Sequence, residues 1–566
     1  MNNHFRCMAL RGLSLFTAAA LLTACAASQA AAPAASESTA DEAVTFMAPY
    51  LNVEAFIDKV HSIYPEVNIE IVPYSGDNTT SCIQNMIEAH DLPDICTVTV
   101  YNPMTDDMSD QLIDLAGYDF TDNYIESRLQ EVTDNGAIYL LPSVYNCYGI
   151  TYNKTLLQQN GWTVPTSFAE LEQLAEKAEA AGVALCLPQS QYPGYGFQYM
   201  CNIADAGFLG TLDGKRWQKD YLSGKANVSG TPGMMQAMAY IQKWRDIGML
   251  NGDGDPTSDE VTRQRMINGD ALFLLGSTNG IVEADGTRDK FGLMPYLSED
   301  GSQNVFVLSV NRYFGLNKRL EQNPQKLEDA LKVMRVLSTV EGTTALYPET
   351  KVKSSLMPFK NAKANDTYYT DIADALNFGS TAPFIYSGWE NTIVTTGNKM
   401  LDFMRGDAAI DEVIAQLDAD QDKVVNNTPD LITTAAEDIP QEDCARLVGR
   451  CFAEATGSDL ALVSLGTWIS GNPTEQNHYG VSGKLYAKGL TDYDLSVILP
   501  TGWNRTIQTV TLTGSQINDL LTEGYDAYGN GKCYPYVLVS PAAVQEDKTY
   551  QVAICGVSDK LAAEAE

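Results

Sequence analysis

The segment after position 43 alternates short apolar stretches with amphipathic ones, and this alternation restricts the possible folds most. Residues 44–48, 67–73 and 94–100 are typical of buried strands, whereas residues 53–63 and 81–89 have the periodicity of helices. Strands interleaved with helices of this length predict a parallel sheet with crossover helices. Ligands of such sheets bind outside the carboxyl ends of the strands, which lie here near Tyr50, Tyr74, Tyr101 and Asn102.

A different pattern precedes this sheet. Residues 1–25 contain Arg6 and Arg11, followed by an apolar run that ends at Leu22. Because about 20 apolar residues are needed to span a bilayer, this shorter run is typical of a secretory signal peptide. Residues 22–25, Leu-Thr-Ala-Cys, resemble a bacterial lipobox, in which Cys25 is lipidated and becomes the mature N-terminus. The alternative is an ordinary signal peptide in which Cys25 is incidental.

Residues 26–42 are mainly Ala, Ser, Thr, Pro and acidic residues. Such a segment cannot bury enough apolar surface to offset its ordering entropy, so it is expected to form a disordered tether. No second long apolar run follows, so membrane attachment is expected through the lipid on Cys25 alone. These features predict a lipid-anchored protein on the extracellular face of the cytoplasmic membrane, or in the periplasm.

Length and charge restrict the class of protein further. A chain of 566 residues is too long for one core and predicts two to four domains. A hydrophobic fraction of 45% with 19% charged residues is that of a globular protein. The net charge of −35 argues against nucleic acid as a partner, because binding its phosphates requires Lys and Arg to displace counterions.

Cysteine usage leaves two interpretations open. Nine cysteines lie beyond Cys7 and Cys25, and no two of them form a CxxC pair. The first interpretation is that they are buried small apolar residues. The second is that some form disulfides, for which the candidate pairs are Cys82 with Cys96 and Cys444 with Cys451.

Several ordered segments in the middle of the chain carry a family resemblance. Ser167-Phe-Ala-Glu170 is a capping box, and the helix predicted over residues 168–181 ends at Gly182, which suits the position after a helix. The strand end Tyr152-Asn-Lys precedes this helix in the sequence. The Pro-x-Ser-Phe-x-Glu-Leu pattern of residues 165–171 covers the start of the helix. Further matching segments are residues 265–276, 291–295, 327–342 and 406–417. In this order and spacing they resemble the extracellular solute-binding protein family 1 of ABC importers.

The resemblance covers residues 43–425 and implies an α/β fold, a two-lobed clamp of the type II kind. The ligand of such a clamp lies between the lobes, the lobes close by a hinge, and the closed form docks on permease subunits in the membrane. No catalysis and no cofactor are implied, because binding energy goes into selecting the closed state.

Candidate ligand-binding residues combine aromatic rings with carboxylates and amides, the groups that recognise sugars. Residues 191–199 and 386–390 offer both kinds of group. The candidate residues are Tyr50, Tyr101, Asn102, Tyr145, Tyr195, Trp389 and Glu390. They favour an oligosaccharide as the solute, although any single aromatic can instead pack in the core of a lobe. Packing or surface roles are expected for Trp162, Trp217 and Trp244.

The acidic run at residues 251–260 places carboxylates at alternate positions, as a calcium loop does. Pro256 stands where the loop needs Gly, and Thr262 stands where it needs a bidentate Glu, so a solvated loop is the better interpretation. No metal site and no catalytic residue are predicted, since the G-x-S-x-G, Walker A and G-x-G-x-x-G motifs are missing from the sequence.

Residues 426–440 are expected to form a linker, after which a second pattern begins. A helix is expected over residues 446–455, a strand over 457–463, a strand, turn and helix over 506–521, and a closing strand over 548–553. In this order they resemble the C-terminal domain of the 5′-nucleotidase family. The resemblance predicts a smaller α+β domain over residues 441–566.

The expected function of this C-terminal domain is not catalysis. In the family's turn an Asn and a substrate-contacting Arg are expected, and Ser464 and Ile469 stand in their places. The four histidines are scattered, so they cannot supply the metal ligands of a metallophosphatase domain. The candidate binding residues are Trp503, Arg505 and Tyr536. The chain is therefore expected not to be an enzyme. Nucleotide binding or catabolism through this domain, and a surface sensing or adhesion protein without a permease, are the alternatives.

Overall fold

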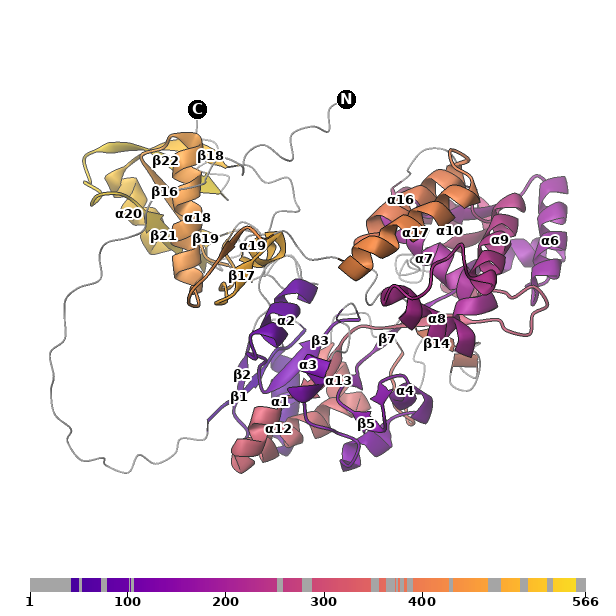
Figure 1. Ribbon diagram of the computed structural model, residues 1–566, viewed down its shortest axis with the longest axis horizontal. Helices are drawn as coiled ribbons and strands as arrows, with labels where there is room; N and C mark the ends of the chain where they lie inside the picture. The colour runs from indigo at the N-terminus through magenta and orange to yellow at the C-terminus, as the bar shows by residue number, and fades with distance from the viewer. Residues whose placement is uncertain are drawn as a thin grey trace. The chain divides into compact units, whose positions relative to one another are not determined.

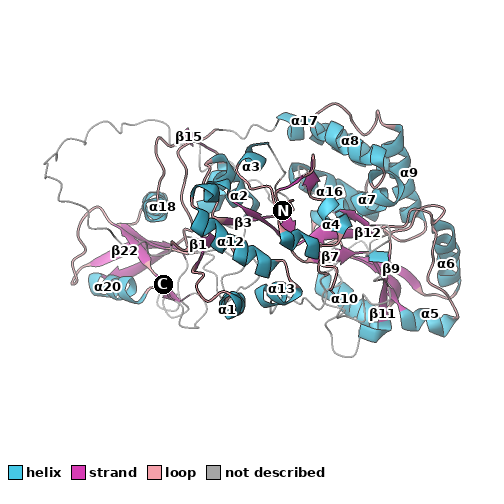
Figure 2. Cartoon of the chain, turned by 90° about the horizontal axis from the view of Figure 1, so that it is seen from below, coloured by secondary structure: helices cyan, strands magenta, loops and turns pink. Residues whose placement is uncertain are grey.

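The computed structural model describes residues 42–49, 53–72, 79–100, 102, 106–251, 258–276, 288–347, 356–362, 372, 375–376, 381–383, 390–426, 431–466, 480–498, 507–526 and 533–555. The predicted signal peptide, Cys25 and nearly all of the predicted tether lie outside these residues. Residues 43–566 form one compact unit. It contains two α/β lobes, a small linking sheet and a C-terminal α/β unit (Figure 1; Figure 2).

Lobe 1 is built on a five-stranded sheet in the order β2-β1-β3-β13-β6. As the alternation predicts, β1 (Val44–Phe46) pairs in parallel with β2 (Ile69–Ile71) and with β3 (Ile95–Val98). Two further strands, β13 (Tyr313–Leu316) and β6 (Leu141–Pro142), extend the sheet in antiparallel fashion. The helices of this lobe include α1 (Glu54–Ile63), α2 (Thr79–Glu88), α3 (Asp106–Asp110), α4 (Glu126–Gln130), α12 (Pro324–Leu337) and α13 (Val340–Leu346).

Successive residues of the lobe 1 strands face opposite layers of helices, as the two-residue period of a strand requires. Phe46 and Ile95 pack in one core with residues of α1, α12 and α13. Their neighbours Met47 and Cys96 pack in a second core with Ile83 and Ile87 of α2. Helices therefore cover both faces of the sheet, as expected for a parallel one.

A buried carboxylate joins three elements of lobe 1. Asp94, whose side chain is 2% exposed, accepts hydrogen bonds on Oδ2 from the backbone N and the hydroxyl of Thr45, at 2.9 and 2.7 Å. The ammonium of Lys326 lies 2.9 Å from the same oxygen. Asp94 thus connects the edge of β3 to β1 and to α12.

Lobe 2 is built on a four-stranded sheet in the order β11-β8-β10-β9. The strands are β8 (Ile150–Asn153), β9 (Ala184–Pro188), β10 (Ala271–Leu275) and β11 (Phe291–Met294). The helical elements of this described part of lobe 2 include α5 (Lys154–Asn160), α6 (Phe168–Ala180), α7 (Pro193–Ala204), the π-helix Asp205–Leu209, α8 (Leu212–Leu222), α9 (Pro232–Asp246), α10 (Asp259–Asn268), α16 (Glu390–Arg405) and α17 (Ile410–Asn426).

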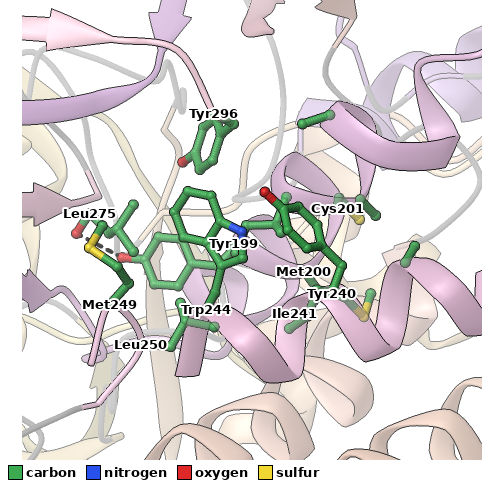
Figure 3. Close-up of a cluster of buried hydrophobic side chains, with 14 of the residues drawn as sticks. Tyr199, Met200, Cys201, Tyr240, Ile241, Trp244, Met249, Leu250, Leu275 and Tyr296 are labelled. Atoms are coloured by element: carbon green, nitrogen blue, oxygen red, sulfur yellow. Dashed lines mark hydrogen bonds between the residues drawn. The ribbon is translucent and has the colours of Figure 1, made fainter. Parts of the chain in front are cut away.

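The core of lobe 2 is rich in aromatic side chains. Figure 3 shows Trp244 of α9 beside Tyr199, Tyr240 and Tyr296. The ring of Trp244 is fully buried and meets that of Tyr240 edge to face, with centroids 6.2 Å apart. Trp217 is also buried, at 5% exposure. Of the packing or surface roles that the sequence left open for these two tryptophans, the structure shows packing.

A three-stranded sheet links the lobes, in the order β14-β12-β7. Through Gly149, β7 (Tyr145–Tyr148) continues into β8 of lobe 2, whereas β12 (Phe306–Val310) continues into β13 of lobe 1. A Cβ atom on Gly149 would lie 2.6 Å from the carbonyl oxygen of Met294, so the crossing point requires glycine. The third strand, β14 (Thr381–Pro383), pairs in parallel with β12. The chain therefore crosses between the lobes more than once.

The C-terminal unit contains the four-stranded sheet β18-β22-β16-β21 between two helices. Its main elements are α18 (Gln441–Thr456), β16 (Leu460–Ser464), α19 (Asp492–Ile498), β18 (Gln508–Thr513), α20 (Gly514–Glu523), β21 (Tyr536–Val539) and β22 (Thr549–Cys555). Ala461 and Val463 of β16 pack against α18, while Leu460 and Leu462 pack with Ile517 of α20. The short strands are β15 (Thr433–Thr434), β17 (Gly489–Leu490), β19 (Tyr525–Asp526) and β20 (Cys533–Tyr534).

Three local details differ from the sequence expectations. The Ser167 hydroxyl accepts from the backbone N of Glu170 as predicted, but the Glu170 carboxylate accepts from the backbone N of Thr166 instead of that of Ser167. The helix expected from residue 446 begins five residues earlier, at Gln441. Residues 433–434, placed in the predicted linker, form β15 and pair with β17.

Candidate functional site

The helix α7 is fixed at the carboxyl edge of the lobe 2 sheet. The hydroxyl of Tyr199 lies 2.9 Å from the carbonyl oxygen of Leu275 at the end of β10 (Figure 3). It also lies 2.8 Å from the carbonyl oxygen of Gln189, just after β9. Tyr199 is fully buried, so this contact is shielded from water. Residues one turn earlier on α7 are consequently held at the edge where ligands of parallel strands bind.

Four side chains meet at this edge, and we call them the tyrosine–aspartate cluster: Gln191, Tyr192, Tyr195 and Asp259. The hydroxyl of Tyr195 donates a 2.6 Å hydrogen bond to Oδ2 of Asp259, in the first turn of α10. The side-chain oxygen of Gln191 accepts from the backbone N of Asp259 at 3.0 Å, and its amide nitrogen donates to the Tyr192 hydroxyl at 3.0 Å. The cluster thus joins α7 to α10.

The cluster presents an aromatic surface. Tyr192 is 55% exposed, and its ring centroid lies 6.2 Å from that of Tyr195, which in turn lies 6.2 Å from that of Tyr199. The three rings form a ladder that runs from solvent into the core of lobe 2. Exposed aromatic faces of this kind suit the apolar face of a sugar ring or another flat apolar group.

The electrostatics of the cluster assign its donors and acceptors. Burial, and then the hydrogen bond to Asp259, raise the pKa of Tyr195 well above its ordinary value, so its hydroxyl stays protonated and donates. The other carboxylate oxygen of Asp259, Oδ1, is buried and has no hydrogen-bond partner within the described part of the chain. A buried acceptor without a donor is costly, so this oxygen is suited to receive a hydroxyl or amide donor from a ligand.

Asn102 has a structural place at the edge of lobe 1. Its side-chain oxygen accepts from the hydroxyl of Thr99 at 2.8 Å, and its amide nitrogen donates to the backbone oxygen of Thr80 at 2.9 Å. Asn102 is 7% exposed. It therefore ties the residues after β3 to the first turn of α2, and ligand contact by Asn102 stays a prediction that this geometry does not favour.

Tyr145 lies in a buried polar network near the linking sheet. It is 1% exposed, the guanidinium of Arg128 lies 5.2 Å from its ring centroid, and its hydroxyl lies 3.5 Å from a carboxylate oxygen of Glu131. Arg128 also donates to Glu131 at 2.8 Å and to the Thr381 hydroxyl of β14 at 3.2 Å. Burial raises the pKa of Glu131 even though Arg128 opposes this effect. Arg128 of α4 thus connects Tyr145 of β7 to β14, and the ring of Tyr145 is not accessible to a sugar in this structure.

Comparison with known proteins decides the family. The family described as bacterial extracellular solute-binding protein matches residues 53–347, just over half of the 566-residue chain. The chain belongs to this family.

Individual members of the family are distant relatives. The maltodextrin-binding protein MdxE of Bacillus subtilis (strain 168) is 26% identical over 185 residues, which are 31% of this chain and 40% of that protein. Less than half of MdxE is therefore covered by the match.

Solved structures of solute-binding proteins share the fold of this one at lower identity. The binding protein MsmE of Bacillus subtilis subsp. subtilis str. 168, in an open conformation, has a TM-score of 0.58 at 14% identity, over 69% of this chain and 99% of that one. The apo form of RafE from Streptococcus pneumoniae has a TM-score of 0.54 at 16% identity, over 68% and 98% of the two chains. RafE has also been solved in complex with raffinose. The expected two-lobed solute-binding fold is thus confirmed.

Several candidate residues of this solute-binding protein fall outside the described part of the chain. Tyr50, Tyr101, Trp389, Trp503 and Arg505 lie there, as do residues 252–257 of the acidic run. The backbone of Glu390 begins α16, but its side chain is not described. The predicted roles of these residues stay predictions.

Tyr536, the third candidate of the C-terminal unit, packs in the core beside β18 and α20 and is 7% exposed. In this position its ring does not offer a stacking surface. Conversely, Asp259 appeared in the sequence only as part of the acidic run at residues 251–260, which was interpreted as a solvated loop. A further signal for it is the helix start at Ser258, whose hydroxyl accepts from the backbone N of Val261 at 3.3 Å and places Asp259 in the first turn.

Cysteine, metal and membrane features can be stated for the described residues. Cys96, Cys444 and Cys451 are thiols, so neither of the two candidate disulfides is formed. No group of three or more His, Cys, Asp or Glu side chains in the described ranges could hold a metal ion. Within the same ranges, no helix has both the length and the apolar character needed to cross a membrane.

Proposed function

We propose that this solute-binding protein captures an oligosaccharide for an ABC importer and delivers it to the permease subunits without chemical change. The observation that supports this proposal best is the tyrosine–aspartate cluster. It combines an exposed aromatic face at Tyr192 with a buried carboxylate oxygen of Asp259 that has no donor among the described residues. Sugars present both an apolar ring face and hydroxyl donors, so they fit this pair of groups.

The relatives support the same class of solute. Their names mention maltodextrin, raffinose and chitin oligosaccharide. We therefore propose a carbohydrate of two or more sugar units as the ligand. Attachment to the membrane through a lipid on Cys25 belongs to this proposal, because a tethered receptor stays near its permease.

We also propose that the C-terminal unit is a non-catalytic module that resembles the C-terminal domain of the 5′-nucleotidase family. The packed position of Tyr536 supports this view, since a stacking residue for a base would need an accessible ring. The proposed module has a structural or interaction role in place of nucleotide hydrolysis.

The test is thermal unfolding of residues 26–566 with a panel of malto-, raffinose-type, chito- and xylo-oligosaccharides, nucleosides and nucleotides. A ligand at 100 times its Kd should add about 2.7 kcal/mol to the free energy of unfolding. Stabilisation by one class of saccharide is the expected result. No stabilisation by any saccharide, together with stabilisation by nucleosides, would contradict the proposal and assign recognition to the C-terminal unit.

A further inference from the structure

The C-terminal unit contacts lobe 1 through a short segment, residues 484–488. Lys484, Tyr486 and Lys488 alternate with Leu485, which is 2% exposed and packs in the core of the C-terminal unit. Backbone hydrogen bonds of 2.8 and 3.0 Å join Leu485 to Ile439 of the same unit. Since alternate residues of an extended chain point to opposite sides, Lys484 and Tyr486 face away from the core that contains Leu485, and Lys488 follows them in a bend. We call Lys484, Tyr486 and Lys488 the docking strip.

Each residue of the docking strip meets a partner on or just after α2 of lobe 1. The ammonium of Lys484 lies 2.6 Å from Oδ2 of Asp91, and the hydroxyl of Tyr486 donates to the same oxygen at 3.0 Å. The ammonium of Lys488 donates to Asn85 at 2.8 Å and lies 2.7 Å from Oε2 of Glu88.

The partners lie on one side of α2, because Asn85 and Glu88 are three residues apart in a helix. Beside them, α19 of the C-terminal unit also contacts α2. The contact is polar in character. The apolar residues of α2, such as Ile83 and Ile87, belong to the core of lobe 1, whereas those around Leu485 belong to a separate core.

The charges at this contact are held by further groups. Lys488 also lies 3.0 Å from Oδ1 of Asp494, a carboxylate whose side chain is 3% exposed. Lys484 lies 4.5 Å from the ring centroid of Tyr486, and Tyr486 itself is 7% exposed. The strip is therefore preorganised by its own unit, which lowers the entropy cost of binding α2.

The order of the chain does not by itself explain the contact between the C-terminal unit and lobe 1. The helix before the C-terminal unit, α17, belongs to lobe 2, where the backbone oxygen of Leu417 accepts a hydrogen bond from the hydroxyl of Tyr221 in α8. The C-terminal unit thus follows lobe 2 in the sequence but binds lobe 1 in space. Acidic residues outnumber basic ones in this chain, 72 to 37. Two lysines that both face carboxylates of the other lobe therefore indicate a specific contact between the C-terminal unit and lobe 1.

We propose that the docking strip is a built-in binding surface for α2, which fastens the C-terminal unit to lobe 1. The unit then moves with lobe 1 when the lobes change their relative position. It also covers one side of α2, so an external partner of lobe 1 has to bind elsewhere or displace the C-terminal unit. Direct ion pairs carry the contact, so it weakens with ionic strength.

The test is hydrogen–deuterium exchange of the intact chain, residues 26–566, carrying K484E/K488E. Residues 79–91 should exchange about tenfold faster than in the unsubstituted protein, because the hydrogen bonds to charged groups that cover them are lost. Protection of α18 and β22 should not change, since their core is untouched. The control K243E removes an ion pair between Lys243 and Glu299 in lobe 2 and should leave residues 79–91 unaffected.

Charge reversal on the other side of the contact completes the experiment. Adding E88K/D91K to K484E/K488E should restore slow exchange of residues 79–91. If protection of α18 falls in K484E/K488E, the variant Glu88→Gln with Asp91→Asn is used, because it leaves the C-terminal unit unchanged and should also speed exchange. Unchanged exchange of residues 79–91 in variants that keep α18 protected would overturn the proposal.

Discussion

The hydroxyl of Tyr195 donates a 2.6 Å hydrogen bond to Oδ2 of Asp259, across 64 residues of sequence. This bond holds α10 against α7 and leaves Oδ1 of the same carboxylate buried without a hydrogen-bond partner in the described ranges. One carboxylate thus serves both the architecture of lobe 2 and, in the proposed function, the ligand. Substitution of Tyr195 removes only the hydrogen bond that holds α10 against α7. It therefore separates this structural role of Asp259 from its proposed role as an acceptor for the ligand.

Replacing Asp259 should weaken binding of the saccharide found in the panel. The Asp259→Ala variant loses a charged acceptor, and hydrogen bonds to charged groups contribute about 1.5–3 kcal/mol, so the Kd should rise about ten- to a hundredfold. The Tyr195→Phe variant should raise it less. Titration calorimetry measures both. The control is Asp411→Asn, an exposed acid in the first turn of α17, which should keep the original Kd. An unchanged Kd in Asp259→Ala would show that Asp259 does not contact the ligand.

Truncation of Trp244 should destabilise lobe 2. This side chain is fully buried among aromatic rings, so Trp244→Ala should lower the free energy of unfolding by about 3–5 kcal/mol. The matched variant Tyr192→Ala should change stability by no more than about 0.5 kcal/mol, because Tyr192 is 55% exposed. Differential scanning calorimetry measures both. Equal losses in the two variants would contradict the assigned packing.

Acid should destabilise lobe 1 through Asp94. Burial alone would raise the pKa of Asp94, but hydrogen bonds from Lys326 and Thr45 outweigh it and lower the pKa below its ordinary value. A lowered folded-state pKa gives a contribution that is present above the unfolded-state pKa, about 3.9, and lost as the pH falls through the folded-state pKa. The variant Asp94→Asn should therefore be less stable at pH 7 and lose less stability below pH 4. Urea unfolding between about pH 2.5 and 7 measures this, and parallel curves for the two proteins would contradict it.

Thiol chemistry should separate exposed from buried cysteines. Cys451 is exposed, whereas Cys96, Cys147 and Cys186 are buried. Burial raises the pKa of Cys96 to about 12, which leaves almost no reactive thiolate at pH 8. Iodoacetamide should label Cys451 in the native protein and these three only after unfolding, as read by peptide mass spectrometry. Recovery of a peptide bridged between Cys444 and Cys451 would show instead that a disulfide forms.

The parallel strands of lobe 1 could be predicted from the sequence because their signals are local. Residues 44–98 alternate apolar strands and amphipathic helices, and each crossover connects neighbouring strands. The strand β13 could not be predicted in its place. It inserts next to β3 from more than two hundred residues away, and its four residues have no period that distinguishes it.

The candidate site was predictable in part for the same reason. The stretch from Gln191 to Tyr199 shows its amide and tyrosines directly in the sequence, and Tyr195 does lie in the cluster. The carboxylate that completes the cluster comes from an acidic run that was interpreted as a solvated loop. Tyr145 was predicted to bind the ligand but is buried. The sequence alone does not distinguish a core tyrosine from a ligand-binding one, because the contact with Arg128 that marks Tyr145 as buried is seen only in the structure.

The insertion of β13 between β3 and β6 also sets an order of events during synthesis. The three parallel strands of lobe 1 emerge first, but the edge of β3 stays unpaired until residues 313–316 have been made. Lobe 2, in turn, waits for α16 and α17 before its helical layer is complete. Contacts between such distant segments form slowly. The growing chain therefore completes neither lobe until more than half of it has been made.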